Sequence, residues 1–204
     1  MKVRMTSHST PDNIIGVDDA QELIAYCARV SNPGNQNNKD TSEKLIKYLI
    51  KHQHWSPLEM VSACLEIETT RDIARQILRH RSFSFQEFSQ RYADPTKAMS
   101  FQSREARLQD PTNRQNSIPL DFDIESQRRL NEEFRMKQHA LWRESEKIYN
   151  WAIDKGIAKE QARVVLPEGM TISRLYMNGT LRSWVHYIDL RSANGTQKEH
   201  QDIA

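Results

Sequence analysis

The chain has 204 residues, of which 37% are hydrophobic and 27% are charged, and its formal net charge is +2. This length and composition favour a single globular domain spanning residues 1–204. No apolar run approaches the roughly 18 residues that a membrane helix needs. The N-terminus has no apolar segment of the signal-peptide type, so a cytoplasmic location is expected. The net charge is too small to indicate a nucleic-acid partner by itself.

The sequence pattern of residues 1–70 predicts two helices between two strands. Residues 1–8 are expected to form a strand and residues 19–30 a helix, followed by a polar loop at 31–38. Asp40 is expected to cap the next helix, with Glu43 completing a capping box, and that helix continues to about residue 53.

Residues 61–70 alternate between apolar and polar side chains. The alternation predicts an antiparallel strand with Ala63 and Ile67 on its inner face and Cys64, Glu66 and Glu68 on its outer face.

The remaining chain is expected to be mainly helical. Helices are predicted at 71–79, at 123–155 with Gly156 as the terminator, around 160–163 before Pro167, and at 181–188. A strand is predicted at 171–177, and residues 94–119 are expected to be irregular. Strands and helices do not alternate regularly. The predicted class is therefore α+β: a mainly antiparallel sheet flanked by helices, one of which is long.

Arginine is concentrated in one short stretch of this nearly neutral chain. Its members are Arg71, Arg75, Arg79, Arg81 and Arg91, opposed only by Asp72 and Glu87. Guanidinium groups match phosphates and carboxylates bidentately, so the cluster indicates a site for small anionic ligands. If residues 82–92 are extended, Glu87, Ser89 and Arg91 share one side, which suits a phosphorylated sugar. The alternative is a solvated basic helix end, whose arginines offset the helix dipole.

A family resemblance adds to this pattern. Arg79-His80-Arg81, seven residues, Ser89, one residue and Arg91 resemble the motif of the flavin-dependent thymidylate synthases. Further segments that resemble the family, in the same order, are residues 28–31, 54–59, 160–163 with Leu166-Pro167, and 181–187 with Leu190-Arg191. The resemblance covers most of the chain.

The resemblance implies an enzyme that converts dUMP to dTMP, with FAD as cofactor and methylenetetrahydrofolate and NADPH as co-substrates. It implies cofactor contacts from Ser31, His54, Ser56, Glu59, Arg79, His80, Arg81, Glu87, Asn178, Thr180 and His186. It implies that dUMP is held by Gln76, Glu87, Ser89, Arg91, Arg163 and Arg191, of which Ser89, Arg91 and Arg191 are the expected catalytic residues. It also implies a homotetramer with active sites shared between subunits. From the sequence itself, no metal, nucleic acid or membrane partner is expected.

The last block of the chain departs from the family pattern at two positions. Thr180 stands where many relatives have asparagine, with Asn178 two residues earlier. His186 stands where some relatives carry a second asparagine that faces the flavin. Flavin contacts in this block are therefore less firmly implied than the nucleotide contacts.

Other residues have simpler interpretations. The spacing of His52, His54 and Glu59 matches no strong zinc pattern. On a helical wheel Arg191 falls beside Trp184, so it is expected to point partly inward and to need an acceptor, although a plain helix-terminal arginine is the alternative. The aromatic residues Phe83, Phe85 and Phe88 are assigned to packing, and Trp142, Tyr149 and Trp151 to the core or a subunit interface.

Two other functions stay open. The first is a related pyrimidine-nucleotide modifying enzyme on the same scaffold, for which the departures at Thr180 and His186 leave room. The second is a single-stranded nucleic-acid-binding module that uses the basic segment together with its interleaved aromatic residues. Neither cysteine, Cys27 or Cys64, is expected to act as a nucleophile, because Cys27 is buried on a helix face and Cys64 lies beside glutamates.

Overall fold

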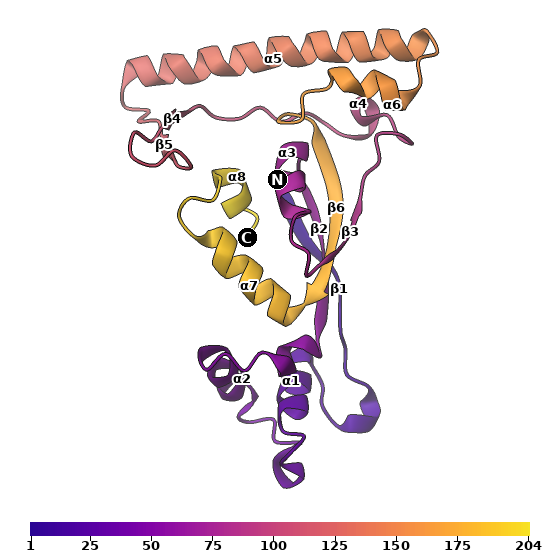
Figure 1. Cartoon of the computed structure of the whole chain (residues 1–204), viewed down its shortest axis with the longest axis vertical. Coiled ribbons are helices and arrows are strands. Elements are labelled where there is room, and N and C mark those ends of the chain that lie inside the picture. The colour runs from indigo at the N-terminus through magenta and orange to yellow at the C-terminus, as the bar shows by residue number, and fades with distance from the viewer.

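A four-stranded antiparallel sheet forms the centre of the protein (Figure 1). The computed structural model describes residues 1–204, apart from the side chain of Ile14. The strands are β1 (Lys2–His8), β2 (Ser62–Thr70), β6 (Ile172–Thr180) and β3 (Ser84–Glu87), in that spatial order. The predicted α+β class with a mainly antiparallel sheet is confirmed.

Strand β2 carries the predicted alternation, with one exception. Ala63 and Ile67 are buried on the inner face, as predicted. Glu66, expected on the exposed face, is only 6% exposed. Neighbouring strands explain this burial: Arg4 Nε lies 2.8 Å from the Glu66 carboxylate, and the Tyr176 hydroxyl donates to it at 2.7 Å. The exposed-face prediction was wrong for Glu66 because a strand's own sequence does not reveal its cross-strand partners.

Two helices follow directly from the long central strands and pack on the inner face of the sheet. They are α3 (Arg71–Ile77) after β2 and α7 (Leu181–Ser192) after β6. The Thr180 hydroxyl caps α7 by accepting from the backbone N–H of Ser183. The core between these elements contains Ala63, Ile67, Ile73, Ala74, Ile77, Phe83, Leu175, Met177, Trp184 and Tyr187. A short last helix, α8 (Lys198–Gln201), contacts both α3 and α7.

One end of the sheet carries α1 (Ala20–Ala28) and α2 (Ser42–Lys51), with the 3-10 turns η1 (Asn13–Ile15), η2 (Pro33–Asn35) and η3 (Ser56–Glu59). Asp19 caps α1 through the Glu22 N–H. The predicted capping box was wrong: α2 begins after Thr41, and Glu43 pairs with Lys47 instead. A small core of Ile24, Leu49, Leu58 and Val61 holds this end together.

The long helix α5 (Glu125–Asp154) lies across the opposite end of the sheet (Figure 1). It ends at Asp154 with Lys155 as its C-cap, and Gly156 follows with φ +77°, as expected for a terminating glycine. Trp142 and Tyr149 pack on α6 (Lys159–Ala162), η4 (Arg163–Val165) and Met170. The region expected to be irregular contains only α4 (Pro95–Ala98) and the small hairpin of β4 (Arg107–Gln109) and β5 (Ser117–Pro119). Across the helices that the structure describes, no segment combines the length and apolarity of a membrane span.

Candidate active site

The arginine–histidine motif lies at the turn that joins α3 to β3. Helix α3 ends at Ile77, and residues 78–83 turn back toward the sheet. Arg79 and Arg81 are exposed there, and no carboxylate in the described part of the chain forms an ion pair with either. Phe83 follows them and is buried against Trp184, which anchors the turn in the core. The turn therefore presents two unpaired guanidinium groups on a fixed backbone.

His80 and Arg191 meet at this turn. Arg191 Nε donates to His80 Nε2 at 2.9 Å, although the two residues are 111 positions apart. Burial lowers the pKa of His80, and the charges of Arg191 and Arg79 lower it further. A neutral imidazole that accepts at Nε2 carries its proton on Nδ1. The predicted inward orientation of Arg191 is confirmed, and its acceptor is this imidazole.

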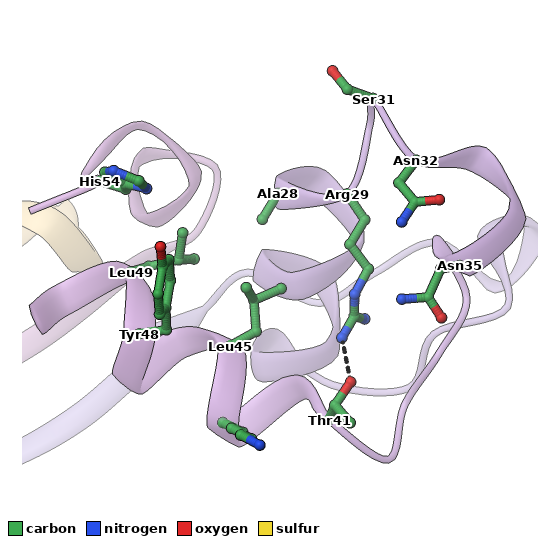
Figure 2. A pocket seen from close by; sticks show the side chains of 11 residues that line it. Ala28, Arg29, Ser31, Asn32, Asn35, Thr41, Leu45, Tyr48, Leu49 and His54 are labelled. Carbon is green, nitrogen blue, oxygen red and sulfur yellow. Dashed lines mark hydrogen bonds between the residues drawn. The ribbon is translucent and has the colours of Figure 1, made fainter. Parts of the chain in front are cut away.

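A cavity of about 570 Å³ lies between α1, α2 and the loop before η3. Figure 2 shows His54 above Tyr48 on one side of it and Ser31 with Asn32 on the other. The Arg29 side chain extends toward Thr41 and donates to its hydroxyl at 2.8 Å. This volume is typical of a small-molecule or cofactor site. Two of the predicted cofactor residues, Ser31 and His54, therefore line one cavity.

Other predicted cofactor residues lie between η3 and α7. Ser56 and Glu59 belong to η3, and Glu59 forms an ion pair with Arg182 of α7. The His186 ring lies 4.4 Å from that of Trp55 between ring centroids. Asn178 is exposed on the outer face of β6, and Thr180 is occupied as the cap of α7.

A second cavity, of about 380 Å³, lies near α6 and the start of α3. Its charged and amide-bearing lining residues are Arg71, Arg75, Gln90, Glu160, Gln161, Arg163 and Glu168. Carboxylates hold two nearby arginines: Arg75 Nε donates to Glu168 at 2.8 Å, and Arg91 Nε donates to Glu160 at 3.1 Å. The Gln90 side-chain amide is buried, and its Nε2 has no partner in the described chain. The cavity offers several donors to an anion.

Glu87, Ser89 and Arg91 do not share one face of a strand. Strand β3 ends at Glu87, and Ser89 and Arg91 lie in the following turn, where the Ser89 hydroxyl accepts from the Arg91 N–H at 3.3 Å. Glu87 accepts from Ser173 at 2.7 Å and lies 3.5 Å from Arg71 Nη1. The alternating geometry expected for residues 82–92 was therefore wrong beyond Glu87.

The predicted site residues form three groups within one chain. Ser31 and His54 lie at the α1–α2 end, His80 and Arg191 between α3 and α7, and Arg163 at the α5–α6 end (Figure 1). Gln76 of α3 belongs to the middle group, where its amide contacts His200 and Gln197. The first cavity contains the group of Ser31 and His54 and the second contains Arg163, so neither of these two cavities contains all three groups.

Some polar residues at these places were missed by the sequence reading. Arg29 is 8% exposed and shapes the first cavity, and Arg71 and Arg75 line the second. The predicted arginine cluster for anionic ligands did include Arg71 and Arg75, but neither was named among the individual site residues. His200 is fully buried, and its position near the end of the chain gave no signal of burial.

The structure is an α+β domain in which arginine side chains line both cavities. The comparisons with known proteins identify the family. Residues 13–204 match the family described as thymidylate synthase complementing protein. The chain is 49% identical over 204 residues to a probable flavin-dependent thymidylate synthase of Paramecium bursaria Chlorella virus 1, covering 100% of this chain and 90% of that protein. It is also 49% identical over 206 residues to a flavin-dependent thymidylate synthase of Synechocystis sp., covering 100% and 91%.

A solved structure agrees with these relatives. The UMP/dUMP methylase PolB from Streptomyces cacaoi, bound with 5-Br dUMP, aligns with a TM-score of 0.76 and 25% identity, covering 99% of this chain and 85% of that one. The chain therefore belongs to the flavin-dependent thymidylate synthase family. The family predicted from the sequence is confirmed, and with it the class of flavin-dependent methyltransferases.

Proposed function

We propose that this chain converts dUMP to dTMP, with FAD as cofactor, methylenetetrahydrofolate as carbon donor and NADPH as reductant, in the cytoplasm. The observation that carries the proposal is the junction of α3 and α7, where Arg191 donates to His80, and where the sequence neighbours of His80, Arg79 and Arg81, are exposed and form no ion pair within the described residues. Every ligand of this reaction is anionic, which suits such a junction. Both cysteines are free, which fits a reducing compartment.

The residues present fit a flavin dinucleotide. Arg79 and Arg81 offer free guanidinium groups to its pyrophosphate, and the cavity with Ser31 and His54 offers a partly apolar recess of about 570 Å³. Ser56, Glu59 and His186 lie on the elements beside that recess. When bound, the reduced flavin supplies the hydride that completes the methyl group.

The nucleotide is assigned to the second cavity and its neighbours. A phosphate would compete with Glu160 for Arg91 and would also meet Arg163, whose side chain donates to the Glu160 backbone carbonyl at 3.3 Å and forms no ion pair within the described residues. Glu87 and Ser89 are suited to the ribose, since one offers a carboxylate and the other a hydroxyl. Gln76, in the middle group, adds an amide to the nucleotide contacts.

Arg191 is assigned to the uracil ring. Its Nε donates to His80 at 2.9 Å, which restrains the guanidinium and leaves its terminal nitrogens free of that hydrogen bond. Negative charge develops on the uracil carbonyls as the ring becomes enolate-like, and an oriented cation stabilises that charge. His80, neutral because of burial and its cationic neighbours, accepts from Arg191 without competing for the substrate's charge.

We assign the complete site to a homotetramer in which subunits share residues. The separation of the three groups along one chain supports this assignment. A second support is an exposed apolar stripe on α5, formed by Leu130, Phe134, Leu141, Ile148 and Trp151, which are 38–56% exposed. Their helical spacing places them on one side, as at an interface. Light scattering should report four copies, and a fully active monomer would refute the assignment.

A second candidate function has a specific observation in its favour. PolB, a structural relative over 99% of this chain, is described as a UMP/dUMP methylase. The same scaffold therefore accommodates a ribonucleotide, and this chain could be a related pyrimidine-nucleotide modifying enzyme. Competition of UMP against dUMP distinguishes the two: a dTMP synthase should ignore UMP in at least tenfold excess, whereas a broader methylase should convert it.

Arg91→Ala tests the nucleotide assignment. Losing a charge-assisted contact to phosphate should cost about 1.5–3 kcal/mol, or roughly ten- to a hundredfold in the Kd for dUMP. Flavin binding and unfolding temperature should stay close to those of the natural chain. Lys97→Ala is the matched control, because Lys97 is also an exposed cation paired with a carboxylate, Asp94, at 3.8 Å. Calorimetry that finds the dUMP affinity of Arg91→Ala unchanged within twofold would refute the assignment.

A further inference from the structure

Histidine 200, in the last helix of the chain, ties together the two helices that carry the central group of site residues. It is fully buried, and both ring nitrogens have partners. Nε2 lies 3.0 Å from the Tyr187 hydroxyl of α7, and Nδ1 lies 3.2 Å from Gln76 Oε1 of α3. A side chain that only filled space at this position would not need two polar contacts in the core.

The proton positions follow from one carboxylate. Glu199 can only accept, so the Gln197 amide nitrogen, 2.8 Å away, must donate to it. Gln197 therefore turns its oxygen toward Gln76, whose amide nitrogen donates to it at 2.8 Å. This leaves the Gln76 oxygen facing His200. The imidazole must then carry its proton on Nδ1 and accept from Tyr187 at Nε2.

His200 is neutral in this arrangement. Burial lowers its pKa to about 4, and the charge of Arg191, together with that of His80 once it is protonated, adds to the effect. The side chains facing it are Gln76 from α3, Tyr187 from α7 and His80, whose ring centroid is 6.2 Å away. A neutral imidazole has one donor and one acceptor, so it sets the direction of both hydrogen bonds at once.

The contacts of His200 continue through Tyr187 to His80, the central residue of the Arg79-His80-Arg81 motif. Tyr187 packs edge-on against His80, with ring centroids 4.8 Å apart, and His80 accepts from Arg191. The orientation of Gln76, the Tyr187 ring and the His80–Arg191 pair is therefore linked to α8. Burying a polar side chain without its hydrogen-bond partners is costly, so this network of buried side chains favours one arrangement of Gln76, His200 and Tyr187.

We infer that His200 is a positioning residue for the nucleotide site. Its Nδ1–H donates to the Gln76 side-chain oxygen and so holds the Gln76 amide in the orientation that binds dUMP. This inference rests on the proposed function, because Gln76 is assigned there to dUMP. His200 itself does not contact the substrate. The C-terminal helix α8 is then the element that fixes the site residues of α3 relative to those of α7.

Two isosteric variants separate the bonds of His200. The amide nitrogen of His200→Asn can replace Nδ1–H and keep the donor to Gln76. The amide oxygen of His200→Gln can replace Nε2 and keep only the acceptor for Tyr187. In the flavin-loaded full chain, His200→Gln should weaken dUMP binding about tenfold, whereas His200→Asn should stay within about threefold of the natural chain. Ile203→Val controls for altered packing of the same C-terminal segment, since Ile203 packs on the central core without a side-chain hydrogen bond.

The outcomes distinguish the inference from the proposed function. Equal dUMP affinities for the two His200 variants would overturn the inference, including the case in which both lower the unfolding temperature equally. Nitrogen-15 NMR of the natural chain should find the His200 proton on Nδ1, and a proton on Nε2 would overturn the inference even if the variants fail to fold. A natural chain that binds flavin but no dUMP would instead refute the proposed function.

Discussion

Glycine 179 is the position where adding one carbon should have the clearest effect on this fold. A Cβ at this residue of β6 would lie 2.4 Å from Cδ1 and 2.7 Å from Cε1 of Phe83. Such distances are below any real contact, so the ring would have to move. The ring is 8% exposed and is enclosed by Trp184 and Tyr187, with centroids 4.8 Å and 5.9 Å away. Gly179→Ala therefore forces an overpacked core.

The expected destabilisation is about 1–3 kcal/mol, the usual range for extra carbon in a packed interior. For a chain of this size each kcal/mol corresponds to roughly 2–4 °C in the unfolding temperature. Thermal unfolding followed by circular dichroism measures it. Phe83 follows the motif turn, so flavin affinity should fall as well. Gly34→Ala is the control, because its Cβ would meet nothing within 4 Å.

A second substitution tests the cause. Phe83→Ala removes the atoms that the new Cβ would strike, so it should cost less in the Gly179→Ala chain than in the natural chain, with a coupling of about 1 kcal/mol. The steric reasoning fails if Gly179→Ala unfolds at the same temperature as Gly34→Ala, or if the two core substitutions simply add.

The remaining predictions concern protonation and the cysteines. The pKa of His200 is lowered from 6.5 to about 4 on folding, so the unfolded chain binds more protons between these pH values. The free energy of unfolding should therefore decrease as the pH is lowered from 6.5 toward 4. The loss from pH 7 to pH 5 should be about 2 kcal/mol by urea unfolding, and His200→Asn should remove it; a natural chain equally stable at both pH values would contradict this. Burial raises the pKa of the Cys27 thiol, which opposes thiolate formation, so Cys27→Ser with Cys64→Ser should keep most dTMP turnover. A folded, flavin-loaded double variant without turnover would restore a thiolate mechanism.

Local sequence patterns were sufficient to predict the main elements of the fold. The period-two alternation of residues 61–70 predicted β2, and the long apolar period with Gly156 predicted α5 to within two residues at its start. The helical wheel predicted that Arg191 points inward. These features depend on neighbours close in the chain, which the sequence displays directly.

Features that depend on distant neighbours could not be predicted in the same way. The partner of Arg191 is His80, 111 positions away, and Glu66 is buried by Arg4 and Tyr176 from two other strands. At α2 the choice between Asp40 and Thr41 as the cap is a local competition that the sequence leaves open. The roles of the site residues came from family resemblance, since spacing alone left a solvated basic helix end as an equal alternative.

The most direct test of the proposed function is the absorption spectrum of the purified protein during turnover. We expect a bound flavin whose absorbance bleaches with NADPH and returns when dUMP and methylenetetrahydrofolate are added, with one dTMP formed for each flavin reoxidised without oxygen. A protein that carries no flavin and binds single-stranded nucleic acid in a salt-dependent way would contradict this account.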